Sequence, residues 1–72
     1  MVGTFYRRPN PEAAAFVKEG DSVRKGQVIC VLEAMKILNE IECDVGGTIV
    51  KVHAEDAQPV EFGEKLFTIR LS

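Results

Sequence analysis

The residue best suited to take part in a chemical reaction is Lys36, in the stretch "LEAMKILNE". Leu, Glu, Ala, Met and Lys are strong helix formers. The flanking segments "QVICVL" and "IECDVGGTIVKV", however, are rich in β-branched residues and bounded by glycine, as strands are. We therefore expect Lys36 in a turn between two strands. An amine displayed there can attack an activated carboxyl group once an enzyme removes its proton, and the alternative is a solvated surface charge.

The turn itself breaks a local preference. Two-residue hairpin turns need positive φ and favour Asn-Gly or Asp-Gly, whereas the centre of this one would be Met35 and Lys36. Such violations are expected at functional sites, although a longer turn that uses Asn39 would relieve the strain without any function. The two-residue turn predicts these opposed pairs: Ala34 with Ile37, Glu33 with Leu38, Cys30 with Ile41, and Val28 with Cys43.

Other chemistries have little support. Cys30, Cys43 and His53 could supply three zinc ligands, but their spacing fits none of the paired-cysteine zinc patterns, so we predict no metal site. Both cysteines fall in expected strands and are interpreted as reduced core residues of a protein from a reducing compartment. One histidine and no Ser-His or paired-carboxylate arrangement leave no predicted catalytic residues, and we do not expect an enzyme.

Composition points to one small globular domain. The chain has 72 residues, of which 46% are hydrophobic and 28% charged, with a net charge of -2. The longest basic run is "RR", which gives no basic stripe for nucleic acid. No unbroken apolar run is longer than Val28 to Leu32, far short of the roughly 18 to 20 residues of a membrane span. We expect a soluble, monomeric domain with no nucleic-acid or membrane partner.

The chain contains an internal repeat. "VGTFY" from Val2 matches "GGTIV" from Gly46 at an offset of 44, and "VRKGQVICVL" from Val23 matches "VEFGEKLFTI" from Val60 at an offset of 37. Two similar halves are therefore expected around an approximate twofold axis. The change of offset places seven extra residues within "RRPNPEAAAFVKEGDS", where the prolines oppose a helix and predict a projecting loop. A tolerated surface insertion and a functional loop are both open interpretations.

Strand patterns predict the fold class. Short strands at roughly ten-residue spacing, separated by turn signals such as "EGD", "VGG" and "EDAQP", indicate an all-β antiparallel sandwich or flattened barrel. Val28 to Leu32 is apolar at every position, whereas the residues from Glu40 to Val45 alternate between polar and apolar. The strand before Lys36 is therefore expected to be the more buried of the pair.

The motif "EAMKILNEIE" closely resembles the attachment motif of biotinyl domains, and the likeness extends from "GTFY" through "VKEGDSVRKGQVICVLEAMK" to "GGTIVKVHAEDAQPVEFGEKLFTI". The resemblance implies a single biotinyl domain over residues 1–72, with two four-stranded sheets in a flattened barrel of quasi-twofold symmetry. It also implies covalent biotin on Lys36, with Glu33, Ala34, Met35 and Ile37 as its recognition context. Ile37 departs from the methionine that many members have there, and its stiffness could alter the approach of partner enzymes.

The insertion "RRPNPEAAAF" is similar to the thumb loop of biotin carboxyl carrier subunits of acetyl-CoA carboxylase, which places the thumb at about residues 8–15. This likeness implies a non-catalytic carrier that meets biotin protein ligase, biotin carboxylase and carboxyltransferase in forming malonyl-CoA, in a bacterial cytoplasm or a plastid stroma. The chain begins and ends almost on a strand, so we expect a C-terminal fragment of a longer carrier subunit.

Several alternatives are open. The domain could serve another biotin-dependent carboxylase, carry lipoate, or bind a partner noncovalently, although Met35 disfavours lipoate. Tyr6, Arg7 and Arg8 stand where the thumb begins. Either Tyr6 packs and the arginines are solvated, or these residues contact the ureido ring of biotin or a partner enzyme.

Overall fold

The fold consists of antiparallel strands. The computed structural model describes residues 2–61 and 63–72. Its strands are β1 (Val2–Tyr6), β2 (Ser22–Val23), β3 (Val28–Ala34), β4 (Ile37–Glu42), β5 (Gly47–Val52), β6 (Gln58–Glu61) and β7 (Phe67–Leu71). Across these two ranges no residue is helical, and so none belongs to an apolar helix that could cross a membrane. The all-β prediction is confirmed.

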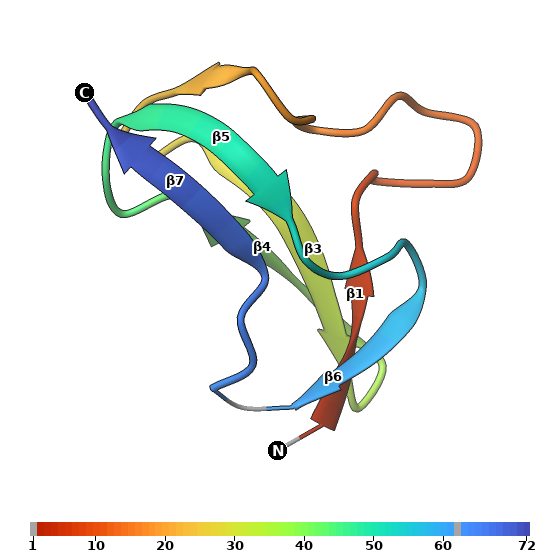
Figure 1. Ribbon diagram of the computed structural model, residues 1–72. Coiled ribbons are helices and arrows are strands. Elements are labelled where there is room, and N and C mark those ends of the chain that lie inside the picture. The colour runs from red at the N-terminus through yellow and green to blue at the C-terminus, as the bar shows by residue number, and fades with distance from the viewer. Residues whose placement is uncertain (1, 62) are drawn as a thin grey trace.

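The strands form two layers, as Figure 1 shows. The first sheet has the order β4-β3-β1-β6 and the second the order β2-β5-β7. The molecule measures 35 × 28 × 19 Å, so it is flattened as expected. One correction concerns the second sheet, which has three strands in the described part of the chain and not four. The offset of 37 that relates β3 to β7 would place the counterpart of β4 at positions beyond Ser72, outside the 72-residue sequence.

Strand pairing confirms the predicted doubling of the chain. Thr4 lies opposite Glu33 in the first sheet, and Thr48 lies opposite Arg70 in the second. Residues 4 and 48 differ by the first offset, and residues 33 and 70 by the second. The pairs Phe5–Leu32 with Ile49–Ile69, and Gly3–Val60 with Gly47–Val23, obey the same offsets. The two halves therefore share their pairing register as well as their sequence pattern.

The repeated glycine has a steric reason. A Cβ at Gly47 would collide with the backbone carbonyl of Arg70 on the neighbouring strand. The equivalent position in the first half is Gly3, where a Cβ would lie 3.1 Å from the carbonyl oxygen of Glu33. Each half thus uses glycine where two backbones approach closely, which accounts for the Gly-Thr pattern at the start of both β1 and β5.

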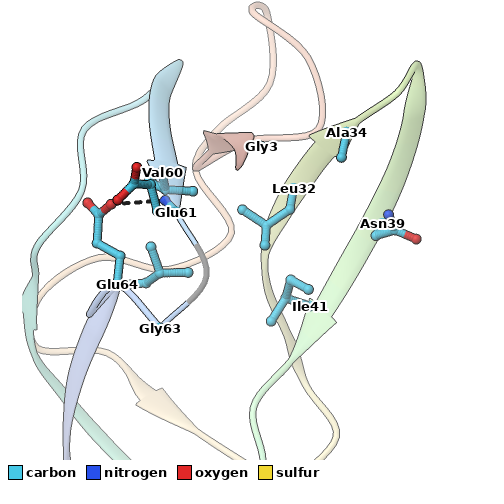
Figure 2. Close-up of a pocket in the computed structure, with 10 residues that line it drawn as sticks. Gly3, Leu32, Ala34, Asn39, Ile41, Val60, Glu61, Gly63 and Glu64 are labelled. Atoms are coloured by element: carbon cyan, nitrogen blue, oxygen red, sulfur yellow. Dashed lines mark hydrogen bonds between the residues drawn. The ribbon is translucent and has the colours of Figure 1, made fainter. Parts of the chain in front are cut away.

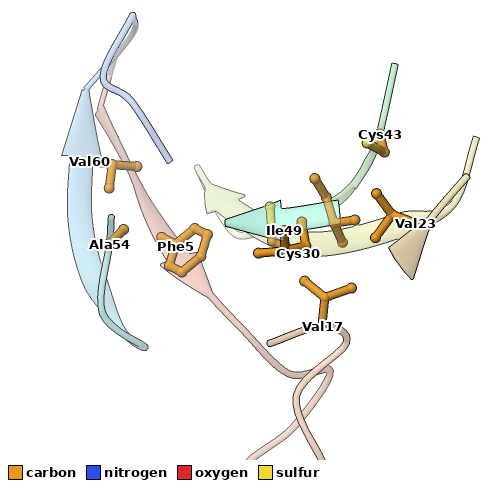
Figure 3. Packing of buried hydrophobic residues seen from close by; sticks show 9 residues of the cluster. Phe5, Val17, Val23, Cys30, Cys43, Ile49, Ala54 and Val60 are labelled. Atoms are coloured by element: carbon orange, nitrogen blue, oxygen red, sulfur yellow. The ribbon is translucent and has the colours of Figure 1, made fainter. Parts of the chain in front are cut away.

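The core lies between the two layers. Phe5 of β1, Cys30 of β3 and Ile49 of β5 are the largest fully buried side chains, and Figure 3 shows them among the buried cluster to which both halves contribute. The rings of Phe5 and Phe67 pack in a tilted arrangement with centroids 5.8 Å apart. Cys30 and Cys43 are both free and buried, as predicted. Burial of these apolar side chains joins the halves into a single unit.

The predicted insertion forms a loop between β1 and β2 that extends away from the sheets in Figure 1. The amide of Phe16 donates a 2.8 Å hydrogen bond to the carbonyl of Arg7 and so closes the loop at its base. Residues 8–15 lie between these two positions, and we refer to them as the thumb loop. Within it, Asn10 accepts hydrogen bonds from the amides of Glu12 and Ala13, which shape a tight turn.

Candidate functional site

Lys36 occupies the tip of the hairpin formed by β3 and β4. Met35 and Lys36 are the two central residues of the turn, with φ angles of 53° and 65°. Positive φ at both positions is the feature of a type I′ turn, whose twist matches that of the flanking strands. The predicted two-residue turn is therefore confirmed, together with three predicted pairs: Ala34 with Ile37, Glu33 with Leu38, and Cys30 with Ile41.

This turn carries conformational strain. A left-handed conformation costs a residue other than glycine about 1–2 kcal/mol of free energy, because its Cβ crowds the following carbonyl oxygen. Met35 and Lys36 are adjacent, and both adopt this unfavourable conformation. The surrounding β3–β4 ladder holds the turn in place, so the lysine is presented at a defined point in space.

One predicted pair in the hairpin is wrong. Val28 lies opposite Glu42 and not opposite Cys43, because the register shifts between Val28 and Cys30. Ile29 is the additional residue of this β-bulge, and it is buried. Instead of pairing in the ladder, Cys43 donates its amide hydrogen to the carbonyl of Gln27 at 2.8 Å. The bulge bends β3 and lets Ile29 join the core.

The hairpin tip exposes apolar side chains around the lysine. Met35 is 90% exposed, Ile37 60% and Leu38 62%. Lys36 is exposed as well, whereas Glu33 and Ala34 are half-buried. We call Met35, Ile37 and Leu38 the tip surface. Large apolar side chains left in water beside an exposed lysine favour a surface that meets another protein. The strand before the lysine is the more buried of the pair, as predicted.

The residues that begin the thumb loop form hydrogen bonds with other groups of the chain. The phenol of Tyr6 donates a hydrogen bond to Oε1 of Glu33 at 3.1 Å. This hydrogen bond, together with desolvation and the charges of Glu33 and Asp56, raises the pKa of Tyr6. Arg7 and Arg8 are half-buried, and their guanidinium groups donate to the carbonyls of Val17 and Ala13, respectively. The expectation of solvated arginines holds only in part, because both guanidinium groups also donate to backbone oxygens while the Arg8 side chain is 38% exposed.

A carboxylate from the β5–β6 turn meets the base of the thumb loop. Oδ1 of Asp56 accepts a 2.7 Å hydrogen bond from the amide of Arg7, and Oδ2 lies 3.9 Å from Nε of Arg8. A cavity of about 410 Å³ opens between the loop and the hairpin. Its walls include Pro9 and Pro11 on one side and Glu33 and Leu38 on the other.

A second cavity, of about 310 Å³, lies where β3 and β4 face β6 and the turn that follows it. Figure 2 shows Leu32 and Ile41 directed toward the side of Val60 and Glu64 across this space. The amide of Glu61 donates to Oε1 of Glu64 at 3.0 Å, which shapes the opposite rim. The hairpin is thus flanked by a cavity on each side.

The three residues considered as zinc ligands have separate environments. Cys30 is fully buried, and burial raises the pKa of its thiol to about 12, so that it remains protonated at neutral pH. His53 is exposed and lies 2.6 Å from the hydroxyl of Thr68. Among the described residues no three His, Cys, Asp or Glu side chains are grouped as a metal ion requires.

Comparison with known protein families assigns the chain. The family described as "Biotin-requiring enzyme" matches residues 1–69, which include the hairpin and every strand except the last two residues of β7. The chain belongs to the biotin-requiring enzyme family. This assignment confirms the family likeness seen in the sequence, and it agrees with the flattened double-sheet architecture.

Individual relatives within the biotin-requiring enzyme family are similar over nearly the whole chain. The chloroplastic biotin carboxyl carrier protein of acetyl-CoA carboxylase from Glycine max is 57% identical over 70 residues, which cover 97% of this chain and 27% of that protein. The biotin carboxyl carrier protein of acetyl-CoA carboxylase from Pseudomonas aeruginosa is 55% identical, covering 96% and 44%. The corresponding Nostoc protein is 49% identical, covering 97% and 38%. The chain thus spans less than half the length of these relatives.

Sequence reasoning missed two residues of this family member's candidate site. The sequence predicts Leu38 opposite Glu33 but does not indicate that Leu38 is part of the exposed tip surface. Leu38 lies beside the turn on β4, which is an edge strand of the first sheet, and no sequence pattern signals that position. Asp56 belongs to the turn signal "EDAQP", which predicts a turn but no contact for its carboxylate. Nothing in the sequence links it to Arg7, which lies 49 residues away.

Proposed function

We propose that Lys36 is the residue to which biotin is covalently attached, and that this domain is the biotin carrier of an acetyl-CoA carboxylase. The observation that carries the proposal is the exposed lysine at the centre of a strained type I′ turn, in a chain whose family requires biotin. Glu33, Ala34, Met35 and Ile37 form its recognition context.

The geometry of the tip fits this modification. In the attachment reaction, Nζ of Lys36 gives up a proton and attacks the activated carboxyl carbon of biotin. A C–N amide bond forms, and the activating group leaves with the electrons of its bond to that carbon. Lys36 is exposed, and the linings of the two cavities do not include it. The amine is therefore accessible to an enzyme that approaches the end of the hairpin.

The tip surface gives a ligase something to recognise. Met35, Ile37 and Leu38 would lose water-exposed apolar area when a biotin protein ligase binds, which favours the complex. The stiff two-strand ladder behind them means that little conformational entropy is lost on binding. Ile37 is 60% exposed, so the β-branched side chain meets the partner directly and not the core.

The carrier role follows from the chemistry of the group. Biotin, when bound, supplies a ureido nitrogen that can hold a carboxyl group, while the protein supplies attachment and position. The domain would present this group to a biotin carboxylase and then to a carboxyltransferase that forms malonyl-CoA, and it would need no catalytic residues of its own. Support for acetyl-CoA carboxylase comes from the relatives, which are named as its biotin carboxyl carrier proteins and are 49–57% identical.

The proposed cellular location rests on the same relatives. They include bacterial and chloroplastic proteins, so a bacterial cytoplasm or a plastid stroma is proposed as the location. Residues 1–72 act as one biotinyl domain in this proposal, with residues 8–15 as its thumb. The longer relatives favour a domain that belongs to a larger carrier subunit, where a tether would raise its effective concentration at both enzymes.

The test is enzymatic biotinylation of matched variants. The wild-type chain, Lys36→Arg and Lys51→Arg are each incubated with a biotin protein ligase, biotin and ATP, and the products are analysed by mass spectrometry. Lys51 is an exposed lysine on β5, so its replacement controls for a general loss of amines. The wild type and Lys51→Arg should take up one biotin, and Lys36→Arg none. Biotin on Lys36→Arg would contradict the proposal, and modification by a lipoate ligase alone would favour a lipoyl carrier.

A further inference from the structure

The contact between Asp56 and the base of the thumb loop joins segments that are far apart in the chain. We propose that Asp56 is a positioning residue that holds the thumb loop beside the hairpin that carries Lys36. The functional meaning of this contact rests on the proposed carrier role, whereas its physical basis depends only on the unmodified chain.

Arg7 is the point at which the contact acts. Its amide donates to Oδ1 of Asp56 at 2.7 Å, and its carbonyl accepts from the amide of Phe16 at 2.8 Å. The same peptide segment is therefore fixed to the β5–β6 turn on one side and to the far end of the thumb loop on the other. Because the acceptor is a carboxylate, the first of these hydrogen bonds is of the stronger, charge-assisted kind. Asp56 thus restrains the near end of the loop directly, and Arg7 links that end to the far end.

The turn that carries Asp56 is itself fixed to β1. Ala57 has a φ of 64°, and its amide donates a 2.7 Å hydrogen bond to the carbonyl of Phe5. The amide of Gln58 closes the turn by donating to the carbonyl of Glu55 at 3.1 Å. A left-handed alanine persists only where its surroundings hold it. The hydrogen bond to Phe5, a fully buried residue, fixes this turn beside β1. The carboxylate of Asp56 then meets Arg7, which lies two residues after Phe5, just beyond the end of β1.

Contacts inside the thumb loop do not replace this restraint. Asn10 organises the turn at the loop's centre, and Nη1 of Arg8 donates to the carbonyl of Ala13 at 3.4 Å. These contacts make the loop a small unit but do not attach it to a sheet. Asp56 and Ala57 line the 410 Å³ cavity together with Pro9, Pro11 and Leu38. Val17 packs in the core and Phe16 packs against it, so they anchor the far end of the loop. The position of the near end, and with it the width of this cavity beside the hairpin, therefore depends on Asp56.

Amide exchange and backbone relaxation of the ¹⁵N-labelled 72-residue chain test the proposal. Asp56→Ala removes both contacts, whereas Asp56→Asn keeps an oxygen that can accept from the Arg7 amide and removes the charge. Glu55→Ala is the matched control, because it deletes an exposed carboxylate from the same turn. The amide of Ile49, which donates to the carbonyl of Asp21 in the second layer, reports on the sheets.

In Asp56→Ala, exchange of the Arg7 amide should accelerate by about tenfold or more. Order parameters in the thumb loop should fall below about 0.6, while those of the strands stay near 0.85. Asp56→Asn should restore most of the Arg7 protection, and Glu55→Ala should match the wild type. An equally ordered loop in Asp56→Ala, or the same loosening in Glu55→Ala, would overturn the proposal. If Asp56→Ala also loosens Ile49, Asp56→Asn decides, and its failure to protect the Arg7 amide would overturn the proposal. Because no biotin is involved, neither outcome depends on whether Lys36 is modified.

Discussion

Tyr6 and Glu33 are joined across two neighbouring strands by a hydrogen bond of 3.1 Å from the phenol to Oε1. Glu33 lies opposite Thr4, and Tyr6 lies opposite Val31, so the bond is diagonal on one face of the first sheet. Glu33 stands three residues before Lys36. The contact therefore connects the start of the thumb loop to the strand that presents the lysine.

The first prediction concerns the ionisation of Tyr6. Its pKa is raised above 10.0, chiefly because the Glu33 carboxylate accepts the phenolic hydrogen bond, with a smaller effect from the charge of Asp56. Glu33→Gln should move the pKa of Tyr6 back toward 10.0, and Asp56→Asn should move it less. Tyr6 is the only tyrosine and tryptophan is absent, so phenolate absorbance reports it directly. A larger effect of Asp56→Asn than of Glu33→Gln would contradict this account.

The second prediction concerns strain at the hairpin tip. Replacing Met35 and Lys36 by Asn and Gly supplies residues that adopt positive φ readily. The free energy of unfolding should rise by about 1–2 kcal/mol, since the relief at two positions exceeds the entropic cost of one glycine. Thermal unfolding should show an increase of about 4–8 °C for each kcal/mol. Lys36→Arg, which leaves the strain in place, is the control, and a less stable double variant would show that the turn is not strained.

The hairpin also shows how far the sequence can predict this structure. A two-residue turn at Met35 and Lys36 was predicted because the strands on both sides are distinct, and one turn position sets the register near the tip. The bulge at Ile29 could not be predicted. Val28 to Leu32 is apolar at every position, so no alternation reveals an additional residue.

The repeat predicts how the strands pair, but it does not predict the contacts that individual side chains make. The offsets anticipate that Thr4 and Thr48 have equivalent partners, because backbone pairing follows the repeated pattern. The contact between Asp56 and Arg7 lies outside the repeat, since only the first half carries the thumb insertion. A carboxylate in a turn has many possible partners, and folding alone decides which backbone amide it meets.

The third prediction concerns the left-handed alanine. Ala57→Gly should stabilise the domain by about 0.5–1 kcal/mol, because relief of the Cβ clash at a φ of 64° outweighs the added freedom of the unfolded chain. Urea unfolding with an unchanged slope would measure the difference. Ala14→Gly, at an exposed position in the thumb loop, should bring no comparable gain. Destabilisation by Ala57→Gly would contradict the strained geometry.

The fourth prediction concerns pH and Cys30. Burial raises the pKa of its thiol from 9.0 to about 12, so the folded state holds the proton more tightly than the unfolded state. The resulting stability is fully present below pH 9.0 and is lost as the pH rises toward 12. Urea unfolding at several alkaline pH values should therefore show a steeper loss of stability in the wild type than in Cys30→Ala. Equal slopes would mean that Cys30 does not contribute to the alkaline loss.

The attachment of biotin to Lys36 is tested most directly by the intact mass of the chain after co-expression with a biotin protein ligase, followed by peptide mapping. We predict one adduct, with the mass of biotin less one water, on the peptide that contains Lys36. Absence of the adduct from a folded sample, with a ligase that modifies another acceptor in the same cells, would contradict the central claim.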